Sequence, residues 1–548
     1  MKKSFKIYSA IALAGTLAFS SCIEETQPQG STATSAQIAQ SSAALEAAAN
    51  GIPAQMSQGY LVYGDQVHET DMGYAQFMIA QTELLGDMYC GGSNSGYDWY
   101  IMYNTLERSI GPNSYMAYLP WFTLYTFIKS DNDIISIAKA GTTADQRKFA
   151  GIAYACRAFN YYMLMSFYEP VENDYTDVSA VKDLTVPFVF ETTTNDMAKN
   201  NPRVSHREMT DSILSDLNKA EKFFATDNNT TNRQLPSLAV VYGIKAKVYM
   251  WDEDYENAAK YARMAINESG ATPMTEDEWT NPTTGFTTAC NGWMWYASYS
   301  AENMGNLCNF VGWMSNEADW GYASLTQPVI DRSLYDRIGA TDFRKHVFLD
   351  PDKSNYYNYQ TCRDKEHIDE TLPAYAGLKF RCKGGDWENY KVGGLIDLPI
   401  MRIEEMYFIE AIATASINNG ARFEEGKTLL NNFMRQYRDP NFSAKSTNMA
   451  DFQKEALYQM RIEFWGEGNA FPIAKRLKVG CMQNYEGTNA KFDVLKVNCK
   501  GIKPSWNFVI PTSEVQANSA LEGKNNPDPT QTVVCPSPLG QYGAKKTK

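Results

Sequence analysis

The chain has 548 residues, a formal net charge of −13 and a hydrophobic content of 44%. This apolar content is typical of a globular protein with a large core, and the acidic balance makes nucleic acid and anionic membrane surfaces poor partners. A neutral ligand is therefore favoured. Beyond residue 22 no stretch is long and apolar enough to span a membrane as a helix.

Residues 1–21 have the pattern of a lipoprotein signal peptide. Three lysines precede an apolar segment at 7–19, which is too short to span a bilayer of about 30 Å, and two serines then precede Cys22. We expect Cys22 to be lipidated and to become the mature N-terminus. The alternative is an ordinary secretory peptide in which this cysteine is incidental.

Residues 22–42 are rich in Gln, Ser, Thr and Ala, which predicts a flexible tether. Folded structure is expected from residue 43, with a helical region at 43–270. Apolar residues at spacings of three and four predict helices at 74–85 and 145–168. Ser205 with Glu208 predicts a capping box that opens a further helix. The apolar face expected for that helix consists of Met209, Ile213, Leu217, Ala220 and Phe224.

Residues 237–251 and 255–266 predict a helical hairpin. Its aromatic and small residues approximate the tetratricopeptide (TPR) repeat, in which small side chains let the helices approach closely. One such hairpin cannot bury its apolar face alone, so neighbouring helices are expected at 209–224, 404–417 and 423–437. A generic helical hairpin is the alternative.

Between residues 271 and 400 helical periodicity fades, which predicts a loop-rich, ligand-binding region. Five of the 11 tryptophans fall between 279 and 320. A flat indole face matches the apolar face of a sugar ring, and nearby amides and carboxylates satisfy its hydroxyls. We expect at least two of the five to be exposed, although core packing is the ordinary role of a tryptophan. The candidate ligand-binding residues are Asn94, Tyr97, Trp99, Trp293, Trp295, Trp313, Asn316 and Trp320.

Catalytic and metal-binding motifs are absent from the sequence. None of the four histidines lies in a motif with a known mechanism, and no spacing completes a metal site, so no catalytic residue, metal or cofactor is predicted. A pair of carboxylates suited to glycoside hydrolysis stays open, because such residues meet in space and not in sequence. Nine cysteines follow Cys22 without a CxxC motif, and their disulfide connectivity cannot be deduced.

Residues 401–548 predict further helices to about 477 and then a proline-rich tail that wraps the surface. Arg402 and Glu405 open one helix. Arg461, Glu463 and Glu467 surround an apolar Phe-Trp pair, which predicts charged side chains paired where helices meet.

Several segments together resemble the SusD/RagB-type glycan-binding lipoproteins of the Bacteroidota outer membrane. One basis is the acidic pair directly after the lipidation cysteine, at 24–25. The others are RAFNYYMLMSFYEPV at 157–171, VPFVFETT at 186–193, PRVSHREMTDSILSDLNKAEKFF at 202–224, the hairpin at 238–266, LPIMRIEEMYFIEAIATA at 398–415 and ALYQMRIEFWGEGNAFPIAKRLKVG at 456–480.

The resemblance implies a mainly α fold, a SusD-like α-α superhelix with 43–548 as one compact unit. It implies no enzymatic activity. It also implies a lipid-anchored position on the outer membrane, where the protein would be a lid on a SusC-like TonB-dependent transporter. The resemblance further implies that the TPR helices face this partner and the aromatic loops face the glycan. The alternatives are a relative that binds peptides or another nutrient, and a glycoside hydrolase.

Overall fold

The structure is a computed structural model. It describes residues 38–532 except 40, 58, 60–69, 93–96, 102–109, 228–230, 302–308, 355–360 and 493–494. The predictions for the signal peptide, Cys22, the tether and Asn94 lie outside the described residues. Within them the protein is mainly helical, as expected, and no helix is long and apolar enough to cross a membrane.

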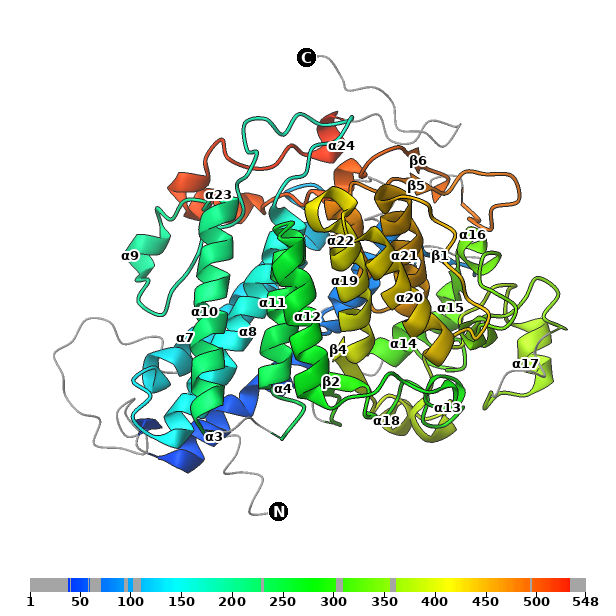
Figure 1. The fold of residues 1–548 in the computed structure, drawn as a ribbon, viewed down its shortest axis with the longest axis horizontal. Helices are drawn as coiled ribbons and strands as arrows, with labels where there is room; N and C mark the ends of the chain where they lie inside the picture. Colours follow the sequence, from blue (N-terminus) through cyan, green and yellow to red (C-terminus); the bar gives the residue numbers. More distant parts are fainter. Residues whose placement is uncertain are drawn as a thin grey trace.

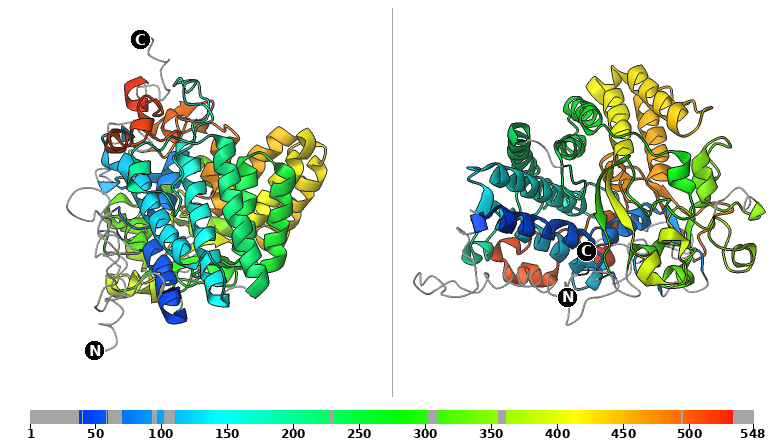
Figure 2. Two further views of the ribbon diagram at one scale, coloured as in Figure 1. Left: turned by 90° about the vertical axis from the view of Figure 1, so that its left-hand side faces the viewer. Right: turned by 90° about the horizontal axis from the view of Figure 1, so that it is seen from below.

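Seven helices form a continuous array in which each packs on the next (Figure 1). In spatial order they are α7 (Tyr115–Ala138), α8 (Ala144–Tyr168), α10 (His206–Asp227), α11 (Leu238–Trp251), α12 (Tyr255–Ser269), α19 (Ile403–Ser416) and α20 (Phe423–Tyr437). The predicted hairpin is α11–α12, and the three neighbours expected for it are α10, α19 and α20. Figure 2 shows the same array from two further sides.

Local sequence signals set the ends of these helices. The backbone amide of Ser205 donates to Glu208 (2.8 Å) and the amide of Glu208 donates back to the Ser205 hydroxyl (3.2 Å), which confirms the capping box at the start of α10. Ser237 caps α11 and Asp254 caps α12. All five residues of the predicted apolar face of α10 are buried.

Small residues let the helices of the array approach closely. The buried face of α12 carries four alanines, and Gly426 of α20 lies so close to α19 that a Cβ there would be 2.5 Å from the carbonyl oxygen of Ala411. Glycine and alanine are thus required at these contacts by the packing distance.

Residues between the two halves of the array form short elements joined by loops, which gather beside α19 and α20 (Figure 1). They are α13 (Glu276–Thr280), β2 (Trp293–Ser298), α14 (Phe310–Met314), α15 (Ala323–Thr326), β3 (Pro328–Ile330), α16 (Arg332–Tyr335), η4 (Phe343–Val347), α17 (Lys365–Glu370), η6 (Lys383–Gly385), α18 (Tyr390–Gly393) and β4 (Asp397–Arg402). The antiparallel pair β2–β4 joins these loops to the array, because β4 leads directly into α19.

The remaining elements cover the array and its ends. They are α3 (Ser42–Ala49), α4 (Gly51–Ser57), α5 (Ala75–Leu85), β1 (Met88–Cys90), α9 (Asn195–Ala198), η7 (Ile417–Gly420), α21 (Met449–Glu463), α22 (Ala470–Arg476), β5 (Cys481–Met482), β6 (Asn498–Cys499), η9 (Pro504–Trp506), α23 (Thr512–Ala517), η10 (Ser519–Leu521) and α24 (Pro529–Thr532). Strand β1 pairs antiparallel with β3, and β5 pairs antiparallel with β6.

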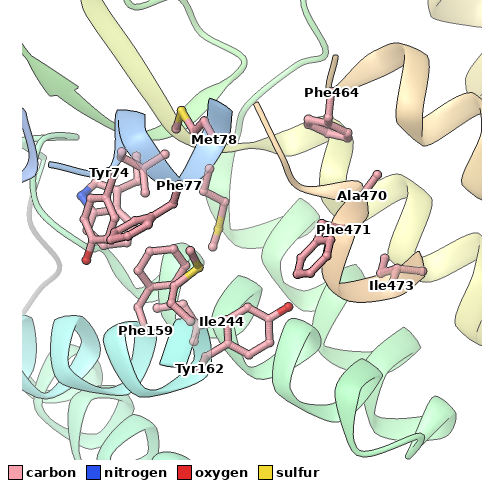
Figure 3. Packing of buried hydrophobic residues seen from close by; sticks show 14 of the residues in the cluster. Tyr74, Phe77, Met78, Phe159, Tyr162, Ile244, Phe464, Ala470, Phe471 and Ile473 are labelled. Atoms are coloured by element: carbon pink, nitrogen blue, oxygen red, sulfur yellow. The ribbon is translucent and has the colours of Figure 1, made fainter. Parts of the chain in front are cut away.

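One hydrophobic core connects the array with α5 and α22. Tyr74 and Phe77, at the start of α5, lie against Phe159 of α8, and the rings of Tyr74 and Phe159 are 5.5 Å apart (Figure 3). Phe471 of α22 packs 6.1 Å from Phe167, at the end of α8. Members of this cluster come from positions as far apart as Leu45 and Leu521, so distant parts of the sequence share one interior.

A buried ionic cluster joins the end of β4 to the helices. Glu463 accepts hydrogen bonds from Arg402 (3.0 Å), Arg438 (2.8 Å) and Arg344 (3.1 Å). Arg402 also donates to Glu467 (2.8 Å). Burial alone would raise the pKa of Glu463, but the three guanidinium groups hold it well below its ordinary value. The prediction of charges paired where helices meet is confirmed.

Candidate ligand-binding surface

Four of the predicted binding residues are buried. Trp293 and Trp295 lie on β2 and are both fully buried, and the Trp295 ring packs 5.2 Å from the ring of Phe159. Trp313 is only 4% exposed, and the Asn316 side chain donates to two buried backbone carbonyls. The expectation that these four residues contact a ligand is wrong, because their side chains are buried and pack or hydrogen-bond inside the core.

The five tryptophans between 279 and 320 therefore differ from expectation. Four are buried, and Trp320 alone among these five is half-buried. The prediction that at least two are exposed is wrong. The cause is the core itself, where Trp279, for example, packs 5.0 Å from Phe286 and 5.9 Å from Phe343.

Tyr97 is the exposed end of a row of aromatic rings. Its side chain is 42% exposed and its ring lies 6.0 Å from that of Tyr322, which in turn is 4.7 Å from the buried Trp313. Trp99 is half-buried and meets the ring of Tyr115 edge-on at 6.2 Å. The row gives an exposed ring a rigid support, because each aromatic ring packs on the next one inward.

A carboxyl pair fixes the turn that carries Tyr97 and Trp99. Asp98, between them, is buried and accepts a hydrogen bond from the amide of Ile101 (3.2 Å). Burial raises the pKa of Asp98 to about 6. Burial and the neighbouring charge of Asp98 raise the pKa of Glu83, on α5, well above its ordinary value. The two carboxyls hydrogen-bond each other, which ties the turn to α5.

A second aromatic group surrounds Trp320. The ring of Tyr390 meets the Trp320 ring at 6.3 Å, and the backbone amide of Asp319 donates to the carbonyl of Trp387 (3.0 Å). The Arg363 guanidinium lies 3.8 Å from the centroid of the Trp387 ring and donates to Asp319 (2.5 Å). Aromatic faces, a carboxylate and a guanidinium thus meet in one place.

His367 helps to fix Arg363 in this group. The guanidinium donates to Nδ1 of His367 (2.7 Å), and Nε2 of His367 faces the carbonyl oxygen of Asn316 (3.1 Å). Burial lowers the pKa of His367, and the charge of Arg363 lowers it further. A neutral imidazole that accepts at Nδ1 and donates at Nε2 satisfies both contacts.

Four residues of this surface are missing from the sequence-based candidates: Tyr322, Arg363, Trp387 and Tyr390. Trp387 and Tyr390 lie between two glycine pairs, at 384–385 and 393–394, and this turn-rich context is a signal that could have found them. Tyr322 and Arg363 carry no comparable pattern. Within the described residues, no group of three or more His, Cys, Asp and Glu side chains could hold a metal ion.

Comparison with known proteins places this fold in a defined class. Solved structures with the same fold include a SusD-like carbohydrate-binding protein from Bacteroides vulgatus (18% identity, TM-score 0.68, covering 89% of this chain and 98% of that one). Surface glycan-binding protein A from Bacteroides thetaiotaomicron is also similar (14% identity, TM-score 0.61, covering 88% and 98%). The fold is therefore that of the SusD-like binding proteins, as expected.

Sequence comparison agrees with the fold. Residues 70–250 match the model of a SusD-like family described as "Starch-binding associating with outer membrane". SusD-like protein P2 from Formosa agariphila is 24% identical over 452 residues, which cover 76% of this chain and 82% of that protein. Both sequence matches are to SusD-like proteins, so the partial family match and the shared fold make this chain similar to proteins described as SusD-like.

Proposed function

We propose that this protein captures oligosaccharide or polysaccharide at the cell surface with the aromatic groups around Tyr97 and Trp320. The observation that carries the proposal is the exposed Tyr97 ring, supported by Tyr322 and held by a buried carboxyl pair, in a protein with the SusD-like fold. Apolar ring faces bind the C–H faces of sugars, while Asp319 and Arg363 offer an acceptor and donors to hydroxyl groups.

Isothermal titration against plant, host and microbial polysaccharides tests glycan capture. For a glycan that binds the wild type, Tyr97→Ala or Trp320→Ala should weaken binding about 5- to 150-fold, the range of a hot-spot aromatic. Phe190→Ala is the matched control, because Phe190 is an aromatic residue of similar exposure (45%) that lies far from the site. It precedes α9, which is across the molecule from α15, and Tyr322 beside Tyr97 directly precedes α15 (Figure 1). Unchanged binding by both site variants at equal folded fraction would contradict the proposal.

The same samples distinguish the alternative functions. New reducing ends would indicate a glycoside hydrolase, and binding of peptides without any glycan would indicate another nutrient. Trp295→Ala is a control of a different kind, because it removes a buried ring. The variant should lose about 3 to 5 kcal/mol of stability, while its folded fraction should bind glycan as the wild type does.

Delivery to a SusC-like TonB-dependent transporter is the second part of the proposal. The outer side of α11 and α12 carries three half-buried tyrosines, with the rings of Tyr249 and Tyr261 stacked at 5.4 Å and Tyr242 at 6.0 Å from Tyr261. Next to them, Leu214 and Tyr249 line a surface groove of about 530 Å³ between α10 and α11. Aromatic surface beside a groove is favourable for protein docking.

A lipid on Cys22 would hold this protein and the transporter in one membrane plane, which raises their effective concentration. Purification of the native protein in mild detergent, followed by mass spectrometry, should recover a TonB-dependent receptor. Double substitution Tyr249→Ala/Tyr261→Ala should reduce that recovery, whereas Phe190→Ala should not. A protein that is always recovered alone would count against delivery.

Surface display is proposed to depend on the acidic pair at 24–25. Replacing both glutamates by alanine should leave lipidation intact and reduce cleavage by protease added to whole cells. Equal cleavage of the wild type and the variant would remove this role.

A further inference from the structure

Two cysteines lie directly opposite each other in the short sheet near the C-terminus. Cys481 of β5 pairs with Cys499 of β6, and the next residues along the two strands pair in the same register. Both side chains are buried, with 7% and 5% of their surface exposed. The loop between the strands, residues 483–497, is therefore closed at its base by two facing cysteines.

The geometry of an antiparallel pair matches that of a disulfide. Residues directly opposite in such a pair have Cα atoms roughly 4.5 to 5.5 Å apart, within the range of about 4.4 to 6.8 Å that disulfides require. The two sulfur atoms are also close enough to hydrogen-bond each other. We propose that Cys481 and Cys499 are joined by a disulfide in the exported protein.

The local charges favour formation of this bond. Burial disfavours a Cys481 thiolate, but the hydrogen bond from Cys499 and the positive charge of buried Lys503 together lower the pKa of Cys481 to about 7. A thiolate is the species that attacks a disulfide, so Cys481 is the better nucleophile of the two. Cys499 then resolves the intermediate.

The reaction is a thiol–disulfide exchange with an oxidised dithiol oxidoreductase of the cell envelope. The Cys481 thiolate attacks one sulfur of the donor disulfide, which forms a mixed disulfide and releases one donor thiolate. Cys499 loses its proton and attacks the Cys481 sulfur, which forms the new S–S bond and releases the second donor thiolate. Two protein thiols are oxidised and one donor disulfide is reduced.

The closed loop supports the segment that leads to Tyr97. Asn489 donates to the carbonyl of Ile330 on β3 (2.8 Å), and Lys491 donates to the carbonyl of Gly92 (2.8 Å), the second residue after β1. The disulfide fixes the base of a loop that holds the β1–β3 pair. Its importance for ligand capture rests on the proposed function, whereas its existence does not.

Peptide mapping tests the bond directly. The full-length protein is exported in an oxidising envelope, extracted in detergent, and alkylated with iodoacetamide under denaturing conditions without reductant. Trypsin should then release residues 479–491 linked to 497–500, because Lys478, Lys491, Lys496 and Lys500 are cleavage sites. The linked pair should be lighter than its two reduced peptides by two hydrogen atoms.

An internal control comes from the same digest. Cys156 lies in the core of α8, and its peptide at 149–157 should be fully alkylated, which shows that buried thiols were reached. Alkylation of both Cys481 and Cys499 in that digest, or pairing of either with another cysteine, would overturn the proposal. This outcome does not depend on ligand binding, so it is separate from a failure of the proposed function.

A stability measurement gives a second test. Reduction should lower the melting temperature of the wild type. The double variant Cys481→Ser/Cys499→Ser should already melt at that lower temperature without reductant. The control Cys290→Ser should show the same fall in melting temperature on reduction as the wild type. If the double variant and the wild type melt together in the absence of reductant, no bond stabilises the wild type there and the proposal fails.

Discussion

His206 joins three helices of the array through two carboxylates, and this contact predicts a pH-dependent stability. Its Nδ1 lies 3.0 Å from both oxygens of Glu169, directly after α8, and its Nε2 lies 2.7 Å from Asp252, directly after α11. His206 is itself the first residue of α10. Replacement His206→Gln removes a charge that holds the ends of all three helices together.

The size of the effect follows from the pKa of the imidazole. Hydrogen bonds to Asp252 and Glu169 raise the pKa of His206 from 6.5 to about 9, against the opposing effects of burial and of Arg476. A shift of this size corresponds to at most about 3 kcal/mol, and we expect about 2 kcal/mol because part of the ring stays in contact with water. Since the folded pKa is raised, this stabilisation is complete below about pH 6.5 and is lost as the pH rises through about 9.

Urea unfolding at about pH 6 and pH 9.5 measures the prediction. The gap in stability between the wild type and His206→Gln should be about 2 kcal/mol at the lower pH and should nearly vanish at the higher one. Lys475 faces the same Glu169 and its pKa is lowered to about 7 by burial, so it titrates in the same range with the opposite sign. The measured quantity is therefore the difference in unfolding free energy between the wild type and His206→Gln at each pH, in which the effect of Lys475 largely cancels. His346→Gln is the control, because the side chain of His346 is 39% exposed. An equal gap at both pH values would refute the reasoning.

Three further predictions concern the anchor, the array and the ionic cluster. Cys22→Ala should move the protein from the detergent phase to the aqueous phase in phase partitioning, and continued partitioning into detergent would place the anchor elsewhere. Gly426→Ala should lower stability by about 1 to 3 kcal/mol in thermal unfolding, because the added Cβ meets the carbonyl of Ala411, whereas Gly51→Ala in open space should not. Arg402→Met should cost about 3 to 5 kcal/mol by leaving Glu463 and Glu467 buried with fewer partners, and near-wild-type melting would contradict this.

The helical array could be predicted because its signals are local. The predicted helix at 423–437 has the bounds of α20, and Ser237 caps α11 where the pattern placed the start of the hairpin. Apolar spacing within one helix and capping residues at its ends depend only on neighbours in the sequence. Neighbouring helices for the hairpin were expected because one hairpin cannot bury its own apolar face.

The candidate binding surface was only partly predictable because exposure is a property of the whole fold. Trp295 and Trp320 have the same chemistry and a similar loop-rich context, yet one packs against α8 and the other lies half-buried beside Tyr390. Trp293 and Trp295 are two residues apart, which on a strand places them on the same face. That spacing was the available hint that both indoles belong to the core.

The ionic cluster explains how such a loop-rich surface keeps a defined position. Arg402 is both the last residue of β4 and the N-cap of α19, so its hydrogen bonds to Glu463 and Glu467 connect the loops to the array. Lys379 donates from the loop side to Glu467 (2.6 Å). Buried charges are tolerated only when every partner is in place, so this cluster favours one arrangement of loops and helices. We therefore expect that any opening over a transporter moves the folded unit as a single body, with the motion taken up outside this core.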